Sequence, residues 1–247
     1  MVAEATGHLA AILIIATGLV MLAAPLGYRL RLWSALTALT KVAALGVLCG
    51  AAAAALALVS VAADGWRAGP GTTAMLVAIV AAGIAAVALP LRVKRLAARL
   101  PFNDVSTDTA AAPAFEALLP ERRRERPGDS GAYDAARLAP LQRSCYPDLA
   151  PLRLPATRDK AFGEALAVAQ TMGWTIVAQD AARGRIEATE RSRWFGFVDD
   201  VVIRLMAEGT GTRVDMRSSS RVGISDLGAN VRRIRAYWAA LASVSGR

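Results

Sequence analysis

The chain has 247 residues, of which 55% are hydrophobic, and it carries 29 Lys and Arg against 20 Asp and Glu, for a net charge of +9. The charges are uneven: residues 1–91 hold four Lys/Arg and two acids, and residues 92–247 hold the remaining 25 and 18. This split excludes both a fully soluble enzyme and a fully embedded transporter. It predicts an all-α transmembrane region of three helices followed by a small α+β domain.

Three apolar stretches, residues 9–26, 41–61 and 72–91, are each long enough to cross about 30 Å of hydrocarbon. The segment before the first stretch contains Glu4 and no Lys or Arg, unlike the positively charged start of a secretion signal, so we expect this stretch to be retained. We therefore predict a three-helix transmembrane region over residues 1–99, with the lipid bilayer as its first partner.

Positive charges gather on one side of these spans. Seven Lys and Arg flank that side, and one, Arg67, flanks the other. The seven are Arg29, Arg31, Lys41, Arg92, Lys94, Arg95 and Arg99. The positive-inside rule then predicts a multi-pass protein of the bacterial inner (cytoplasmic) membrane, with the amino terminus outside and the carboxy-terminal domain in the cytoplasm.

Small residues recur at helical spacing in two of the spans. The second span has Gly46 and Gly50 four positions apart. The third has alanines at the same spacing, at Ala74, Ala78, Ala82 and Ala86. Because such faces let helix backbones approach closely, we expect them to pack a compact bundle or to join two copies of the chain as a homodimer.

Prolines are frequent after the last span, with eight of them from Pro101 to Pro155, and the charged run from Glu121 to Arg126 lies among them. This composition is typical of a linker, so residues 100–144 are predicted to be a Pro/Arg-rich linker that is disordered in part. Its basic cluster has two interpretations, a solvated charge run or a contact with anionic lipid.

Residues 145–247 are predicted to form the soluble domain. A helix is expected from Thr157, because apolar residues recur at helical spacing until Gly173. Four strand-like stretches divided by short turns follow, at residues 174–179, 185–194, 198–207 and 212–221. An amphipathic helix from about Ser225 closes the domain. The expected order is helix, four-stranded antiparallel sheet, helix.

One side of the sheet is predicted to be polar. The alternate residues that share a side of the last strand are Arg213, Asp215, Arg217, Ser219 and Arg221. Glu187, Arg191 and Arg193 share a side of the second strand. If the two sides coincide, the face is either a solvated ladder of ion pairs or a surface for an anionic headgroup, since arginine suits phosphate and carboxylate.

Several strings in this half resemble a known family. They are Gly173-Trp174, Gly184-Arg185-Ile186-Glu187-Ala188, GFVDDVVIR over residues 196–204, VDMRSSSRVGISDLGAN over residues 214–230, and Arg233-Ile234. The pattern resembles the bacterial and plastid family catalogued as domain of unknown function 1499, and the Tyr146-Pro147 opening is similar to its membrane-anchored subgroup. The resemblance implies a domain but no particular reaction, ligand or catalytic residue.

The strand–helix junction at residues 217–230 holds most of the candidate site. In one interpretation it is a structural lock, in which Gly223 permits a turn and Ser225 or Asp226 caps the final helix. In the other, amides at the helix start and arginines of the strand bind an anion. The ligand-binding candidates are Arg217, Ser218, Ser220, Arg221, Ser225, Asp226, Asn230 and Arg233. Secondary candidates are Asp199, Asp200, Arg204 and Glu187.

Catalytic residues, metals and cofactors are not predicted. The only histidine is His8, beside the first span, and Cys49 and Cys145 lie in different halves, so no triad, Cys/His pair or zinc site is expected. Asp199 and Asp200 are adjacent on a strand and point to opposite faces, which disfavours a shared ligand.

Nucleic acid is not an expected partner, because residues 145–247 have 15 Lys/Arg interleaved with 11 acids and lack a stacking platform. The sequence instead favours a membrane protein whose tethered domain is a binding or assembly module for a protein or an anionic ligand. The alternative is a membrane-tethered enzyme that uses the Arg/Ser/Asp strand–helix junction. Binding is preferred because no nucleophile and base pair can be named.

Overall fold

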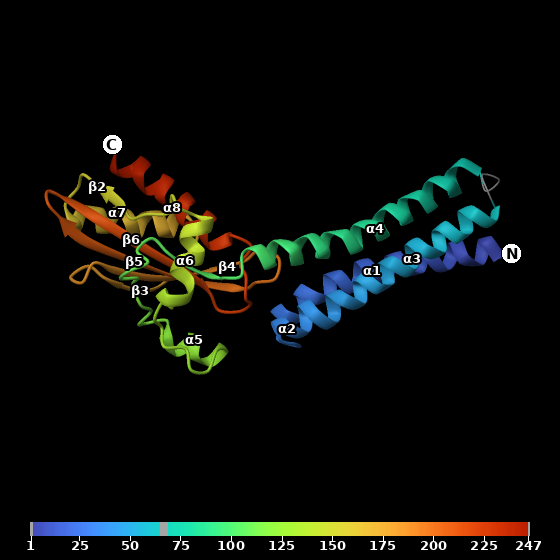
Figure 1. Ribbon diagram of the computed structural model, residues 1–247, viewed down its shortest axis with the longest axis horizontal. Coiled ribbons are helices and arrows are strands. Elements are labelled where there is room, and N and C mark those ends of the chain that lie inside the picture. Colours follow the sequence, from blue (N-terminus) through green and yellow to red (C-terminus); the bar gives the residue numbers. More distant parts are fainter. Residues whose placement is uncertain (1, 65–68, 247) are drawn as a thin grey trace. The chain divides into compact units, whose positions relative to one another are not determined.

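The structure, a computed structural model drawn in Figure 1, describes residues 2–64 and 69–246. The chain forms two compact units. They consist of residues 1–96 with 194–196, and of residues 97–193 with 197–247. Arg67, the single positive charge on the less basic side of the spans, lies outside the described residues.

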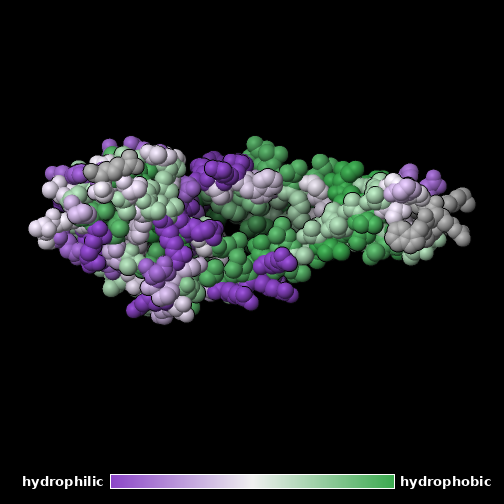
Figure 2. Space-filling view, turned by 90° about the horizontal axis from the view of Figure 1, so that it is seen from above, coloured by the Kyte–Doolittle hydropathy of each residue, from purple (hydrophilic) through white to green (hydrophobic). Residues whose placement is uncertain are grey.

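The first unit is built from long apolar helices. They are α1 (Val2–Arg29), α3 (Ala43–Asp64) and α4 (Gly69–Arg99), with the short α2 (Ala35–Thr37) and the π-helical turn η1 (Ala38–Val42) leading into α3. Three helices, Glu4–Arg29, Ala35–Ala63 and Gly69–Arg99, are long and apolar enough to cross a membrane. Their outward side chains are largely apolar (Figure 2). The predicted region of three apolar helices is therefore confirmed.

Small residues pack these helices against one another. A Cβ atom added to Gly50 of α3 would lie 2.8 Å from the Cβ of Ala86 in α4, and one added to Gly83 would lie 2.5 Å from the carbonyl oxygen of Gly50. Gly46 of α3 faces the side chain of Met21 in α1, whose nearest atom would lie 3.0 Å from an added Cβ. Gly50, Gly83 and Ala86 thus let α3 and α4 approach closely within the chain. The rest of the predicted alanine stripe, Ala74, Ala78 and Ala82, is exposed. A homodimer through these faces stays a prediction.

A six-stranded antiparallel sheet is the centre of the second unit. Its strands are β1 (Asp104–Ser106), β2 (Leu152–Leu154), β3 (Thr175–Asp180), β4 (Arg185–Arg191), β5 (Val198–Glu208) and β6 (Gly211–Ser220). Their order across the sheet is β1-β6-β5-β4-β3, and β2 pairs with β6 as well. β1 and β2 both pair with β6, at residues 217–219 and 212–214 respectively.

The count of six strands corrects the four that the sequence predicts. The four expected strands are β3 to β6. β1 and β2 have three residues each, too short to show a two-residue period, and they are strands because they pair with β6. β1 also lies within residues 100–144, and α5 (Leu119–Glu125) and α6 (Ala135–Cys145) form there too. The expected linker is therefore part of the folded unit, which begins well before residue 145.

Two helices, α7 (Arg158–Thr171) and α8 (Ala229–Ser245), cover one face of the sheet, which we call the helix face (Figure 1). The apolar stripe predicted for the last helix is buried there, with Val231, Ile234 and Leu241 at 1% exposure or less. Ile203 and Val214 are among the strand residues in the same core. Burial of this apolar surface is the main force that holds α7 and α8 to the sheet.

The opposite face carries the charged residues. The register places Glu187 beside Val202, and Val202 beside Arg217, so the two predicted polar sides coincide. This face is not solvated. Residues 107–134, which we call the covering segment, lie over it and bury Phe115 and Leu118 against Val202. We call this surface the covered face.

Candidate functional site

Strand alternation divides the predicted site residues between the two faces of the sheet. Arg217, Arg221 and Asp200 lie on the covered face, where their partners include residues of the covering segment. Ser218, Ser220 and Asp199 point to the helix face, toward α8. The prediction that Asp199 and Asp200 point to opposite faces agrees with this geometry. The junction is consequently two networks and not one pocket.

Arg217 is the most deeply buried arginine of the covered face, at 1% exposure. Its Nε and Nη2 donate to the two carboxylate oxygens of Asp104 at 2.8 and 2.7 Å. Nη1 and Nη2 also donate to the carbonyl oxygens of Pro113, Gly131 and Ala132 at 3.2, 2.8 and 2.9 Å. The guanidinium has five N–H donors, so it is fully satisfied.

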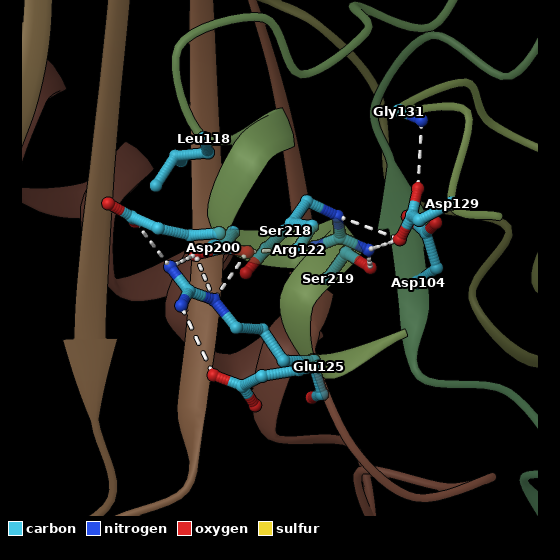
Figure 3. Close-up of polar contacts among 12 residues, drawn as sticks. Asp104, Leu118, Arg122, Glu125, Asp129, Gly131, Asp200, Ser218 and Ser219 are labelled. Carbon is cyan, nitrogen blue, oxygen red and sulfur yellow. Dashed lines mark hydrogen bonds and ion pairs between the residues drawn. The ribbon is translucent and has the colours of Figure 1, made fainter. Parts of the chain in front are cut away.

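Asp200 is the second centre of the covered face, with no exposed side-chain surface. Arg122 of α5 donates from Nη1 to its Oδ2 at 2.9 Å, and the Nε of Arg221 donates to both of its oxygens at 2.9 and 3.0 Å. Figure 3 shows Arg122 reaching from the covering segment between Asp200 and Asp129. One carboxylate of β5 thus ties α5 to the end of β6.

Glu187 fixes the covering segment through its backbone. Its two carboxylate oxygens accept the N–H groups of Glu116 and Leu118, both at 2.9 Å, and Arg185 donates to Glu187 Oε1 at 2.6 Å. Glu187 is 1% exposed, so these donors satisfy a buried charge that would otherwise be costly. A predicted secondary candidate therefore has a direct positioning contact with the segment.

Four charged residues form a third group where the covering segment begins. Arg204 and Arg213 both donate to Asp215, and both also donate to Asp108 of the covering segment, at 3.3 and 2.8 Å. Burial acts to raise the pKa of Asp108, but the N–H groups of Ala111 and Ala110 and the two arginines outweigh it, so this pKa is lowered from its ordinary value.

The helix face holds the remaining junction residues. Ser218 Oγ donates to Asn230 Oδ1 at 2.6 Å, and Arg233 Nη2 donates to Asp199 Oδ2 at 2.5 Å. The amide of Asn230 donates to Ser220 Oγ at 3.2 Å and to the carbonyl oxygen of residue 103 at 3.0 Å. These bonds join α8 to β6 and to the residue before β1.

The loop before α8 is closed by Asp226. Its Oδ1 and Oδ2 accept the N–H groups of Gly228 and Asn230, both at 2.8 Å. The helix begins at Ala229 and not at Ser225, because Gly228 takes a left-handed conformation (φ 78°) just before it. Burial raises the pKa of Asp226 even though two amides donate to it. The capping role proposed for Asp226 is therefore present, and Ser225 accepts the N–H of Leu227 instead.

Sequence reasoning missed the acids and the arginine that complete the covered face. They are Asp104, Asp108, Arg122 and Asp129, all from the segment expected to be a linker. One signal was available: the polar side of β6, together with the residue just after the strand, holds three arginines and a single acid, and a buried face needs carboxylates from elsewhere.

The arrangement favours recognition of charge more than proton transfer. The arginines of the covered face each form an ion pair with at least one carboxylate. Within residues 2–64 and 69–246, no three His, Cys, Asp or Glu side chains come together so that they could hold a metal ion.

Comparison with known proteins agrees with the sequence resemblance. Residues 104–241 match the model of the family described as "Protein of unknown function (DUF1499)". This match covers more than half of the chain, so the chain belongs to that family. The matched region runs from β1 into α8, which means that it includes the covering segment as well as the sheet. No curated protein matches the chain.

Proposed function

We propose that the protein is a membrane-anchored binding module that takes an anionic group at Arg221. Its three apolar helices and its family domain fit a membrane protein. The charged residues of the domain are arranged in complementary pairs, and a carboxylate or phosphate has the same chemistry as the acids that these pairs already contain. An external anion could therefore bind by replacing a carboxylate at the same arginine N–H donors.

The observation that carries this proposal is the unequal hold on Arg221. On its buried side the guanidinium contacts Asp200 at 2.9 Å, and Asp200 has no exposed side-chain surface. On its outer side it contacts Glu121 and Glu125 at 3.2 and 3.3 Å, and these side chains are 41% and 36% exposed. A half-exposed glutamate turns into water at little cost, because exposed ion pairs contribute little stability. An external anion can then occupy the same donors.

Inorganic phosphate added to the full-length protein in detergent tests this proposal. Binding raises the unfolding temperature, by the equivalent of about 2.7 kcal/mol when phosphate is a hundredfold above its Kd. The double variant E121Q/E125Q lacks the competing carboxylates and should respond to lower phosphate concentrations. Glu208→Gln, which removes an exposed partner of Arg153, is the matched control and should respond as the wild type does.

Chloride at equal ionic strength separates binding from charge screening. A phosphate response that chloride reproduces, or one that E121Q/E125Q leaves unchanged, contradicts an anion site at Arg221. An acidic peptide that competes with phosphate would indicate that the natural anion belongs to a protein partner.

We further propose that the three helices cross the bacterial inner membrane as a multi-pass bundle, with the amino terminus outside and the domain in the cytoplasm. The support is the seven flanking positive charges on one side against Arg67 on the other. Reporters active only in the periplasm or only in the cytoplasm, fused after Arg247, test this orientation. Activity of the periplasmic reporter alone would reverse it.

A further inference from the structure

Two exposed apolar side chains stand out in the loops that follow strands of the sheet. Ile224, in the loop between β6 and α8, is 80% exposed, and Trp194, in the turn between β4 and β5, is 59% exposed. Such large apolar side chains are rarely left in water without a partner when they occur close together. Their placement therefore decides whether they form one surface.

The strand register puts the two loops at the same end of the sheet. Arg191 pairs with Val198 where the β4–β5 turn closes, and Ser220 pairs with Asp199 where β6 ends. Within the turn, the N–H of Ser192 donates to the carbonyl oxygen of Phe197 at 2.8 Å, which keeps the hairpin closed below Trp194. Ile224 follows Gly223, whose φ of 85° turns the chain just past the end of β6.

The chain enters the sheet at this same end, a few residues after the last apolar helix. β1 starts at Asp104 beside Ser219, and only residues 100–103 separate it from the end of α4 at Arg99. A chain extends by about 3.5 Å per residue, so the start of β1 stays within roughly 18 Å of the end of α4. The last two turns of α4 carry positive charges typical of the boundary between hydrocarbon and water, including Arg95 and Arg99.

Exposed arginines lie near both apolar residues in the sequence. Arg191 and Arg193 flank Trp194 in the hairpin, and Arg232 lies in the first turn of α8, next to the loop of Ile224. All three are exposed. Tryptophan with an aliphatic side chain and nearby arginines is the composition of segments that bind the headgroup region of a bilayer.

We infer that Trp194 and Ile224 insert into the headgroup region of the bilayer that holds α4, while the nearby arginines contact anionic lipid phosphates. This membrane-docking end requires only that α4 ends at a bilayer, and it does not depend on anion binding at Arg221. Docking holds the strand ends against the membrane surface and limits how the domain turns about its short connection to α4.

Thiol accessibility in nanodiscs tests this inference on the full-length protein. In a background that carries C49A and C145S, one variant has Ile224→Cys and a matched control has Thr210→Cys, in the exposed β5–β6 turn at the other end of the sheet. In nanodiscs of phosphatidylcholine with phosphatidylglycerol, a water-soluble maleimide should label position 224 at least about fivefold more slowly than position 210. A fluorophore at 224, but not at 210, should be quenched by brominated lipids.

Two further variants sharpen the result. Arg191→Gln and Arg232→Gln should each raise the rate of maleimide labelling at position 224, because each removes a contact with lipid phosphates. Nanodiscs of pure phosphatidylcholine, which lack anionic lipid, should also raise this rate. Equal labelling at 224 and 210, without quenching by brominated lipids, would overturn the inference. Protection at 224 that is independent of lipid charge and is accompanied by crosslinks between copies would also overturn it, in favour of a second copy as the occupant. The phosphate response at Arg221 is measured on the same protein and reports separately on the proposed function.

Discussion

The two faces of the sheet are both buried, but different chemistry covers each of them. On the helix face, α7 and α8 lay apolar stripes over Ile203 and Val214. On the covered face, a segment with only one short helix is held by hydrogen bonds from Arg217 to its backbone, by the ion pair of Arg122 with Asp200, and by its own backbone N–H groups bound to Glu187. Apolar contacts tolerate changes of detail, whereas buried charges need their partners in place. The covered face is therefore expected to be the more sensitive of the two to single substitutions.

The largest effect is expected from Arg217→Met. This change leaves Asp104 charged and partly buried, and it removes the donors to three carbonyl oxygens. Loss of one partner from a buried pair costs about 3–5 kcal/mol of unfolding free energy. Denaturant unfolding of the full-length protein in detergent, followed by circular dichroism, measures it.

The double variant Arg217→Met/Asp104→Leu is the control for this measurement, because it removes both charges and should recover part of the loss. A loss below about 1 kcal/mol for Arg217→Met would mean that the covering segment does not depend on this pair.

A smaller loss is expected on the helix face from Leu241→Ala. Leu241 has no exposed surface and belongs to the apolar core, so the variant loses buried area and gains a cavity. The cost is about 3 kcal/mol. In contrast to Arg217→Met, the loss should be the same at low and high salt, since no charge is involved. A strong salt dependence would show that the two faces do not behave independently.

Asp226→Ala should cost about 1 kcal/mol, because the N–H groups of Gly228 and Asn230 lose their acceptor. Asp226→Asn keeps an acceptor oxygen and should cost less. Asp148→Ala, at an exposed pair with Arg235, is the matched control and should change the melting temperature little. If Asp226→Ala melts like the wild type, the loop before α8 is held without the cap, by the side chain of Asn103, which donates to the carbonyl oxygen of Gly223 at 2.7 Å, and by Asn230.

The helix face could be predicted from the sequence because its pattern is local. Val231, Ile234 and Leu241 repeat at helical spacing, and each contributes to the same stripe without reference to the rest of the chain. The cap at Asp226 was predictable for the same reason, since its partners are two and four residues away. The exact start of α8 could not be predicted, because the left-handed conformation of Gly228 places the first helical residue at Ala229.

The covered face could be predicted only in part. Strand alternation predicts that Arg217 and Arg221 lie on the same side of the sheet. It does not predict that the covering segment lies over that side. Arg217 meets Asp104 across 113 positions and Arg122 meets Asp200 across 78, so no local period marks these pairs. The covering segment has the proline and charge content of a linker, and it is ordered by ion pairs that composition does not reveal.

The smallest effect is expected from Asp108→Asn, and it should depend on pH. Asparagine keeps an oxygen for the N–H groups of Ala110 and Ala111 but loses the charge that faces Arg204 and Arg213, so the loss at pH 7 should be below about 1 kcal/mol.

The pKa of Asp108 is lowered in the folded state from an ordinary value of 3.8. Its stabilising charge is therefore fully present above that value and is lost as the pH falls through the folded pKa. The difference in melting temperature between wild type and Asp108→Asn should stay constant from pH 7 to about 5 and shrink below pH 3.8. A difference that grows as the pH falls would mean that Asp108 is protonated more readily in the folded state, and that the arginines around it do not hold its charge.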